Sequence, residues 1–239
     1  MTKMYLNLIR DDLKVAADPA VAESSKRFFK TGEHFLCYGL KSAEVNKIAR
    51  RYVAKAKELP KSEVLALCET LWQSSYQEET SIACILAGKL GNVSTLEDFD
   101  VYADWVNRYV LNWAMCDTLC NHTIGNLVMK YPELTKRLFD WTRSENRWVK
   151  RGSAVTLIIP ARRGLYLPLV FRIADALLQD ADAMVQKGYG WMLKAASEAH
   201  EEEVFDFVME RRAIMPRTAL RYAIEKMPQE KRKLAMSRE

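Results

Sequence analysis

Apolar residues recur along the chain at intervals of three and four positions, which is the period of an amphipathic helix. In KSEVLALCETLW (61–72), directly after Pro60, apolar side chains stand at 64, 65, 67, 68, 71 and 72. Few stretches alternate as strands do. The 9 glycines and 7 prolines are sparse, and most lie between the apolar-periodic runs. The pattern predicts an all-α protein.

Two helix starts can be predicted from capping chemistry. In DPAVAESSKRFF, Asp18 is a candidate N-cap and Pro19 a candidate first helical residue, where the missing N–H of proline costs nothing. In VSTLEDF, Ser94 and Glu97 have the spacing of a capping box, which predicts that a helix begins between them.

One helical pattern recurs, with small residues in the first turns and an apolar run after them. It occurs at 78–90, 116–128, 149–161 and 185–197, and more loosely at 215–227. Successive starts are about 30 to 40 residues apart, the period of HEAT-type repeats. We therefore expect a single HEAT-like repeat domain over 1–239, a helical solenoid with one concave face. Helix N-termini on that face would suit phosphates. The alternative is an irregular helical bundle.

Composition excludes several classes of protein. A hydrophobic share of 49% and a charged share of 28% are those of a globular chain, not a disordered one. We find no apolar run long enough to span a membrane and no signal peptide after Met1, and therefore expect a cytoplasmic protein.

The net charge of +5 is unevenly placed. Residues 1–146 hold equal numbers of basic and acidic side chains, whereas residues 147–239 hold 17 Lys or Arg against 12 Asp or Glu. A basic half favours a polyanionic partner, with nucleic acid preferred to a membrane. A merely solvated basic surface is the alternative.

The stretch WAMCDTLC (113–120) offers two kinds of chemistry. Cys116, Cys120 and His122 are close in sequence, but the five cysteines include no C-x-x-C pair, and the three histidines are isolated. We therefore predict reduced core thiols, with no metal and no cofactor. Trp113 and Asp117 are one helical turn apart and share a helix face.

Further candidates lie at similar positions in the next repeats. Arg151 and Trp191 each fall in the opening turns of a repeat, so two indoles, one arginine and the Asp117 carboxylate would converge on one face of a solenoid. Phosphate contacts would come from four basic residues at similar register: Lys150, Lys187, Arg217 and Arg221. The alternative is that the tryptophans are buried core residues.

These residues resemble those of the AlkD-type DNA alkylation repair glycosylases. The resemblance rests on W-x-x-x-D at Trp113 and Asp117, WVKRGSA with Arg151, and GYGWMLKAAS with Trp191. The segment HFLCYGLKSAEVNKIAR (34–50) is similar to the family's N-terminal F-x-x-x-G motif, and MPRTALRYAIEKM to its last repeat. The resemblance covers nearly the whole chain.

The resemblance implies a HEAT-like solenoid that binds duplex DNA, as a monomer, and excises N3- or N7-alkylated purines without a cofactor. Asp117 would stabilise positive charge on the deoxyribose and hold the attacking water, and Trp113 and Trp191 would flank the sugar and lesion. Arg151 would grip a phosphate. The family is associated with excision without base flipping, and the lack of a matching lysine nucleophile implies a monofunctional enzyme.

Three positions depart from the family pattern and bear on substrate range. Phe29, or its neighbour Phe28, stands where an aromatic hydroxyl that contacts the lesion is common. Gly152 replaces a larger residue, and Ala114 a polar one. Related branches keep the solenoid and lose the catalytic residues. The alternative function is therefore a non-catalytic HEAT-repeat protein that binds DNA structures or another macromolecule.

Overall fold

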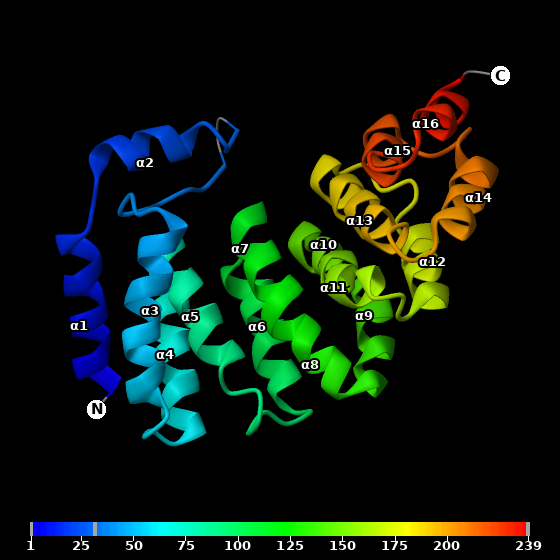
Figure 1. The fold of residues 1–239 in the computed structure, drawn as a ribbon. Coiled ribbons are helices and arrows are strands. Elements are labelled where there is room, and N and C mark those ends of the chain that lie inside the picture. Colours follow the sequence, from blue (N-terminus) through cyan, green and yellow to red (C-terminus); the bar gives the residue numbers. More distant parts are fainter. Residues whose placement is uncertain (1, 31–32, 238–239) are drawn as a thin grey trace. The chain divides into compact units, whose positions relative to one another are not determined.

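The computed structural model describes residues 2–30 and 33–237, in two compact units, Met1–Leu119 and Cys120–Glu239 (Figure 1). Within the described ranges the regular structure is helical, and the β-contact is an isolated parallel bridge between Leu36 and Tyr76. The predicted all-α class is confirmed.

The first unit stacks its helices in two layers. α1 (Thr2–Val15), α4 (Lys61–Gln73) and α6 (Asp98–Tyr109) pack in one layer. α3 (Ser42–Ala56), α5 (Gln77–Gly88) and α7 (Trp113–Thr118) form the other, and α4 packs on α5 between the layers. α2 (Pro19–Lys26) and an irregular stretch connect α1 to α3 (Figure 1).

The second unit repeats this arrangement. After a π-helical turn (Leu119–Ile124), α8 (Gly125–Lys130), α10 (Arg147–Val155), α11 (Ile158–Arg162), α13 (Ala183–Ala196) and α15 (Arg217–Ala223) form one layer. The other contains α9 (Thr135–Trp141), preceded by a 3₁₀ turn (Pro132–Leu134), with α12 (Leu167–Ala176), α14 (Glu201–Arg211) and α16 (Gln229–Met236). Phe171 of α12 stacks on Phe207 of α14 with ring centroids 4.6 Å apart.

The recurring sequence pattern marks the second helix of each pair. Its five copies fall on α5, α7–α8, α10–α11, α13 and α15, which occupy the same layer in their own unit. Stacked helix pairs of this kind are the architecture of HEAT-like repeats, as predicted. The single domain over 1–239 and the concave face stay predictions.

Of the two predicted helix starts, one is confirmed and one is wrong. Asp18 caps α2, with its Oδ1 accepting a 2.8 Å hydrogen bond from the Ala20 N–H. The Ser94–Glu97 box is displaced by one residue, because the Asp98 carboxylate accepts the Thr95 N–H at 2.8 Å. Asp98 also pairs with Lys61 at 2.9 Å, and this ion pair favours the shifted register.

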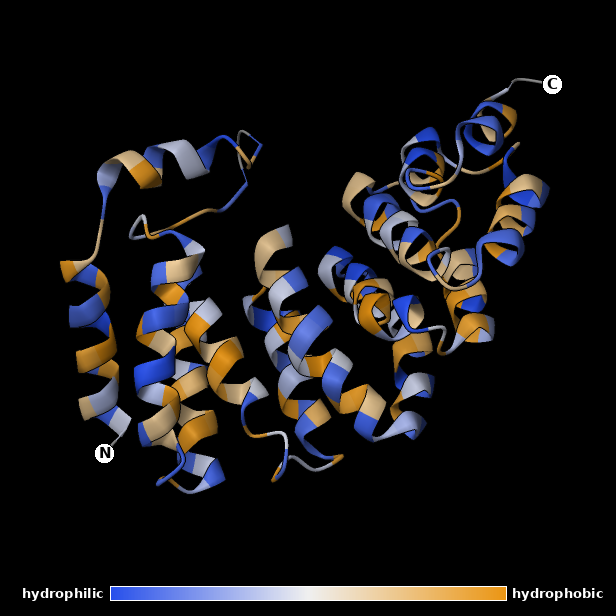
Figure 2. Cartoon of the chain, in the orientation of Figure 1, coloured by the Kyte–Doolittle hydropathy of each residue, from blue (hydrophilic) through white to orange (hydrophobic). Residues whose placement is uncertain are grey.

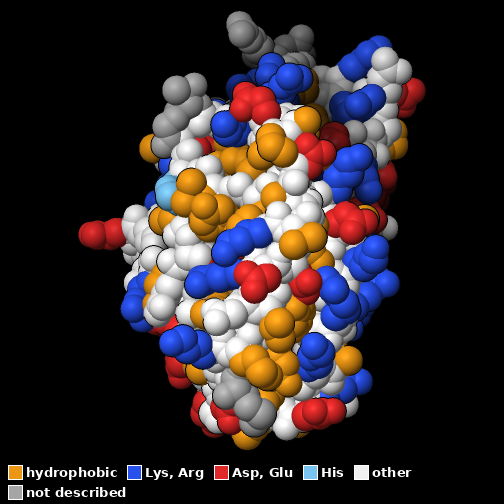
Figure 3. Space-filling view, turned by 90° about the vertical axis from the view of Figure 1, so that its left-hand side faces the viewer, with side chains coloured by type: hydrophobic (Ala, Val, Ile, Leu, Met, Phe, Trp, Pro, Cys, Tyr) orange, Lys and Arg blue, Asp and Glu red, His pale blue; other side chains and the backbone are white. Residues whose placement is uncertain are grey.

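The core contains most of the apolar residues of the periodic runs. Trp72 and Trp105 are fully buried, so for these two indoles the core alternative holds. Figure 2 shows hydrophobic and hydrophilic positions side by side on the helices, as expected for layers that are buried on one side. α1 buries Ile9 and Leu13 against the unit, and Figure 3, seen from the side of α1, shows hydrophobic side chains among basic and acidic ones.

The five cysteines are free thiols. Four are buried (68, 84, 116 and 120), whereas Cys37 is half-buried. The predicted core thiols are therefore found at Cys116 and Cys120. None of the described helices is long and apolar enough to cross a membrane.

Cys37 is expected to be the one cysteine that reacts with iodoacetamide in the native protein. Burial, and then the negative charge of Glu78, raise the pKa of its thiol. Only the thiolate is nucleophilic, so alkylation should be slower than for a free thiol near neutral pH and should accelerate as the pH rises. Burial raises the pKa of Cys68 to about 12. Peptide mapping after labelling at several pH values measures the alkylation rate of each cysteine. Labelling of Cys68 in the native protein would contradict its burial.

Candidate functional site

The helix that carries Trp113 and Asp117 begins at a buried asparagine. Asn112 has extended backbone angles, and its side-chain Oδ1 accepts a 3.0 Å hydrogen bond from the Met115 N–H, which is N-capping geometry. The Asn112 side chain also donates from Nδ2 to the His34 carbonyl at 3.2 Å. One fully buried residue therefore starts α7 and joins it to the stretch before α3.

Three aromatic rings of the first unit form a continuous stack. Phe29 lies between Phe35 and Trp113, with centroid distances of 4.0 Å and 5.4 Å and interplanar angles of 21° in both pairs. Phe29, which we expect at the lesion, is thus the middle ring. The neighbouring Phe28 is 75% exposed and belongs to no ring pair of the described residues, and which of the two phenylalanines contacts the lesion stays a prediction.

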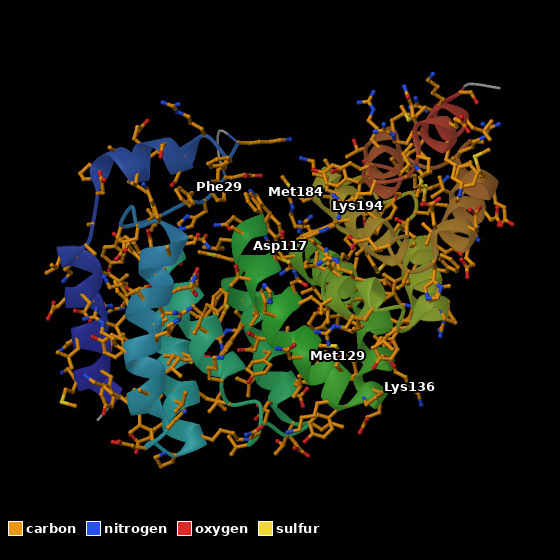
Figure 4. All side chains as sticks on the ribbon, viewed as in Figure 1. Phe29, Asp117, Met129, Lys136, Met184 and Lys194 are labelled. Atoms are coloured by element: carbon orange, nitrogen blue, oxygen red, sulfur yellow. The ribbon has the colours of Figure 1, made fainter. Side chains whose placement is uncertain are left out.

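Trp113 and Asp117 lie on the half-exposed side of α7, and Met115 and Cys116 on its buried side. The structure therefore places Phe29 against Trp113, one helical turn before Asp117, in one unit. Figure 4 labels Phe29 and Asp117. Directly after Thr118 the helix widens into the π-helical turn Leu119–Ile124. Such turns occur frequently at functional sites, and no pattern in the sequence predicted this one.

Arg151 occupies a defined position in the second unit. It lies in α10, which begins after the N-cap Asn146, whose side chain accepts the Trp148 N–H at 2.9 Å. The Arg151 side chain is only 5% exposed, and its Nη1 donates to the Met184 carbonyl of α13 at 2.5 Å. The guanidinium is held by a backbone oxygen and therefore has a fixed orientation.

The two glycines of GYGW let neighbouring helices approach α13. A Cβ at Gly188 would lie 3.1 Å from the Cγ of Arg151, and a Cβ at Gly190 would lie 2.7 Å from the Cβ of Tyr222. Gly188 thus makes room for the arginine. Trp191, half-buried, lies one turn after Lys187 on the same face of α13.

The predicted phosphate-binding residues are not equivalent. Lys150 forms an ion pair with Asp180, and its side chain is 21% exposed. Arg217 donates to the Met236 carbonyl at 3.2 Å. Lys187 and Arg221 take part in no ion pair of the described residues. Of the four predicted residues, Lys187 and Arg221 are therefore the ones whose charge is not already engaged.

The neighbours of Gly152 explain why this position, one of the departures from the family pattern, holds a glycine. A Cβ there would lie 3.1 Å from Cys120 Sγ and 3.2 Å from the Trp141 ring. The Trp141 indole therefore fills the volume that a larger side chain at 152 would need.

The site residues separate into two groups. Phe29, Trp113 and Asp117 are adjacent in the first unit, whereas Arg151 packs against the helix that carries Lys187 and Trp191 in the second. The convergence of both groups on one surface stays a prediction. Sequence reasoning missed Asn112, although an asparagine immediately before a periodic run is a recognisable cap signal. Among the described residues, no group of three or more His, Cys, Asp or Glu is placed to hold a metal ion.

Comparison with known proteins gives one family and two structural neighbours. The family model described as DNA alkylation repair enzyme matches residues 9–227. A predicted DNA alkylation repair enzyme from Enterococcus faecalis has a similar structure, with a TM-score of 0.80 and 17% identity over 89% of this chain and 97% of that one. AlkD2 from Streptococcus mutans has a TM-score of 0.67 and 17% identity over 96% and 100% of the two chains. No curated protein matches the sequence significantly.

Proposed function

This chain belongs to the DNA alkylation repair enzyme family, and we propose that it is a monofunctional DNA glycosylase that excises N3- and N7-alkylated purines from duplex DNA. The products are the free base and an abasic site. The observation that carries the proposal is the half-exposed side of α7, where the Asp117 carboxylate follows the Trp113 indole by one turn and the indole is stacked on Phe29. We propose that the protein acts as a monomer, without a cofactor and without base flipping.

The reaction mainly requires electrostatic stabilisation of the positive charge that develops on the deoxyribose. Alkylation at N3 or N7 makes the purine cationic, so the C1′–N bond breaks with its electron pair going to the base, which leaves neutral. The sugar becomes oxocarbenium-like, and water adds at C1′ and loses a proton. A fixed carboxylate stabilises this positive charge without reorganising during the reaction. We assign this role, and the positioning of the water, to Asp117.

The aromatic residues suit the remaining demands of the substrate. An indole face attracts cationic character, so Trp113 and Trp191 would flank the deoxyribose and the alkylated base. The ring stack restricts Trp113 to one orientation, and Phe29 would contact the lesion side. Because Phe29 has no hydroxyl and its two faces are covered by Phe35 and Trp113, we expect this contact to be made by the ring edge and to depend on shape rather than on a hydrogen bond.

Basic residues of the second unit would hold the DNA backbone. As in the family that the chain resembles, Arg151 would grip a phosphate near the lesion, with a guanidinium that is oriented by its bond to the Met184 carbonyl. Lys187 and Arg221 would add phosphate contacts. Lys150 and Arg217 would contribute less, because Asp180 and the Met236 carbonyl already engage them.

The proposal is tested by incubating the protein with duplex DNA that contains one 7-methylguanine, and by separating free base and DNA strands. We expect free 7-methylguanine and a strand that stays intact until mild alkali cleaves the abasic site. Strand cleavage by the protein itself would exclude the monofunctional assignment.

Lys187→Ala should reduce the salt dependence of DNA binding. Each phosphate contact contributes about 0.9 to the slope of log K against log salt concentration, so losing Lys187 should lower the slope by about one. Lys194→Ala, at the position labelled in Figure 4, is the matched control on the same helix. Lys194 already pairs with Glu225 at 2.9 Å. Fluorescence anisotropy at several salt concentrations measures both slopes. Equal slopes for Lys187→Ala and the wild type would remove Lys187 from the DNA interface.

The non-catalytic alternative makes a different prediction. A HEAT-repeat protein that only binds DNA, or another macromolecule, would leave alkylated bases in place. Its DNA affinity would also be indifferent to removal of the Asp117 charge, or would rise because a carboxylate near phosphates is repulsive. Both functions predict that DNA affinity is kept in Asp117→Asn, so the release of free base by the wild type, and its loss in Asp117→Asn, separates them.

A further inference from the structure

The stretch 33–40 is held by a buried carboxylate forty residues away in sequence. Glu78, in the first turn of α5, is only 4% exposed. Its Oε2 accepts the Tyr38 N–H at 3.0 Å, and its Oε1 accepts the N–H groups of Gly39 and Leu40 at 2.9 Å and 3.0 Å. A buried charge is costly unless it is fully hydrogen-bonded, and these three donors meet that requirement.

The adjacent Glu79 adds a second attachment. It is 1% exposed and accepts a bidentate pair of bonds from Arg10 as well as the Tyr38 hydroxyl at 2.7 Å. Burial and this hydroxyl bond raise the pKa of Tyr38, so the phenol stays protonated and continues to donate. The Gln77 N–H also donates to the Leu36 carbonyl at 2.8 Å. The start of α5 therefore fixes the backbone of 36–40.

The other end of the stretch leads to the candidate site. The His34 carbonyl accepts from Asn112, the residue that caps α7, and Phe35 stacks on Phe29. Phe29 in turn stacks on Trp113, one turn before Asp117. The restrained backbone of 36–40 therefore directly follows Phe35, whose ring stacks on Phe29, and His34, which is hydrogen-bonded to the N-cap of α7.

We propose that Glu78 and Asn112 are positioning residues of the glycosylase site: they clamp the stretch 33–40 so that Phe35 and Phe29 hold Trp113 in place beside Asp117. This inference rests on the proposed function. Neither residue touches the substrate. Their effect is on the orientation of the indole and of α7, and a misplacement of about 1 Å in such a site costs on the order of 100-fold in rate.

Asn112→Asp isolates the clamp from the helix cap. Its carboxylate still accepts the Met115 N–H, but an oxygen replaces the donor that faces the His34 carbonyl. We expect helix content close to the wild type, faster amide hydrogen exchange at 34–40, and a single-turnover rate of base release that falls about 10- to 100-fold. DNA affinity should change little. Asn112→Ser, which caps without adding charge, should behave in the same way.

Glu78→Gln tests the other end of the clamp. The amide offers one acceptor oxygen where the carboxylate offers two, so at least one of the three backbone bonds is lost. Asp98→Asn is the matched control, because Asp98 is a buried carboxylate of the same unit that accepts a backbone N–H and pairs with a lysine away from 33–40. We expect the rate to fall in Glu78→Gln more than in Asp98→Asn at equal loss of thermal stability.

The outcomes distinguish the clamp from the function it serves. If the wild type releases no base, the proposed function fails, while hydrogen exchange at 34–40 still shows whether Asn112 and Glu78 hold the stretch. If the wild type is active and Asn112→Asp, Asn112→Ser and Glu78→Gln all keep its rate, the positioning role is overturned. A rate loss matched by Asp98→Asn would also overturn it, because general destabilisation would then be sufficient.

Discussion

Replacing Asp117 by asparagine is expected to lower the rate of 7-methylguanine release by about 100- to 1000-fold, which is the range for removing one preorganised electrostatic contact to a transition state. Asparagine has nearly the same shape, so α7 and its Asn112 cap should be unchanged. DNA affinity should stay the same or rise. Single-turnover base release and fluorescence anisotropy measure the two quantities.

Asp104→Asn is the control for this variant. Asp104 lies on α6 of the same unit and pairs with Arg108 on the surface, so its loss should leave base release within experimental error of the wild type. An Asp117→Asn protein as active as Asp104→Asn would show that the carboxylate of α7 has no part in the reaction.

Gly39→Ala should be among the most destabilising single changes in the first unit. Gly39 has φ of +92°, and a Cβ there would lie 2.2 Å from the Asp18 carbonyl oxygen. The left-handed backbone costs an alanine about 1–2 kcal/mol, and relief of the overlap costs about 1–3 kcal/mol more. A total of about 2–5 kcal/mol should lower the unfolding midpoint by about 5–15 °C in a thermal melt.

Gly91→Ala provides the comparison at a glycine without these restrictions. The nearest atom to a Cβ at Gly91 would be the Gly88 carbonyl oxygen at 3.7 Å, which is an ordinary van der Waals distance. Its melting midpoint should therefore stay near that of the wild type. If both variants melt alike, the conformation described for Gly39 is incorrect, and with it the physical reason for the glycine in the F-x-x-x-G motif.

Local patterns were sufficient to predict the helices but not every boundary. Periodicity located α4, and the capping chemistry of Asp18 located the start of α2. The start of α6 was misplaced: a cap at Ser94 would begin the helix at Thr95, whereas α6 begins at Asp98, whose carboxylate accepts the Thr95 N–H and pairs with Lys61. The break between α10 and α11 follows from Pro160, which cannot donate to the carbonyl of residue 156.

The site was predictable where its residues share a helix and unpredictable where they are joined across the fold. Four-residue spacing placed Trp113 and Asp117 on one face. Lys150 pairs with Asp180, thirty residues away in sequence, so Lys187 rather than Lys150 is available for a phosphate contact. Glu78 looks like an ordinary acidic residue in the first turn of a helix, and only the return of the chain at 38–40 shows what its carboxylate binds.

The most direct test of the account is the release of free base by the wild-type protein from duplex DNA with one 7-methylguanine, measured under single-turnover conditions beside undamaged DNA of the same sequence. A monofunctional glycosylase produces free 7-methylguanine, releases nothing from undamaged DNA, and leaves a strand that breaks only after alkali. Tight binding to the lesion duplex with no free base would contradict this function and leave a DNA-binding repeat protein.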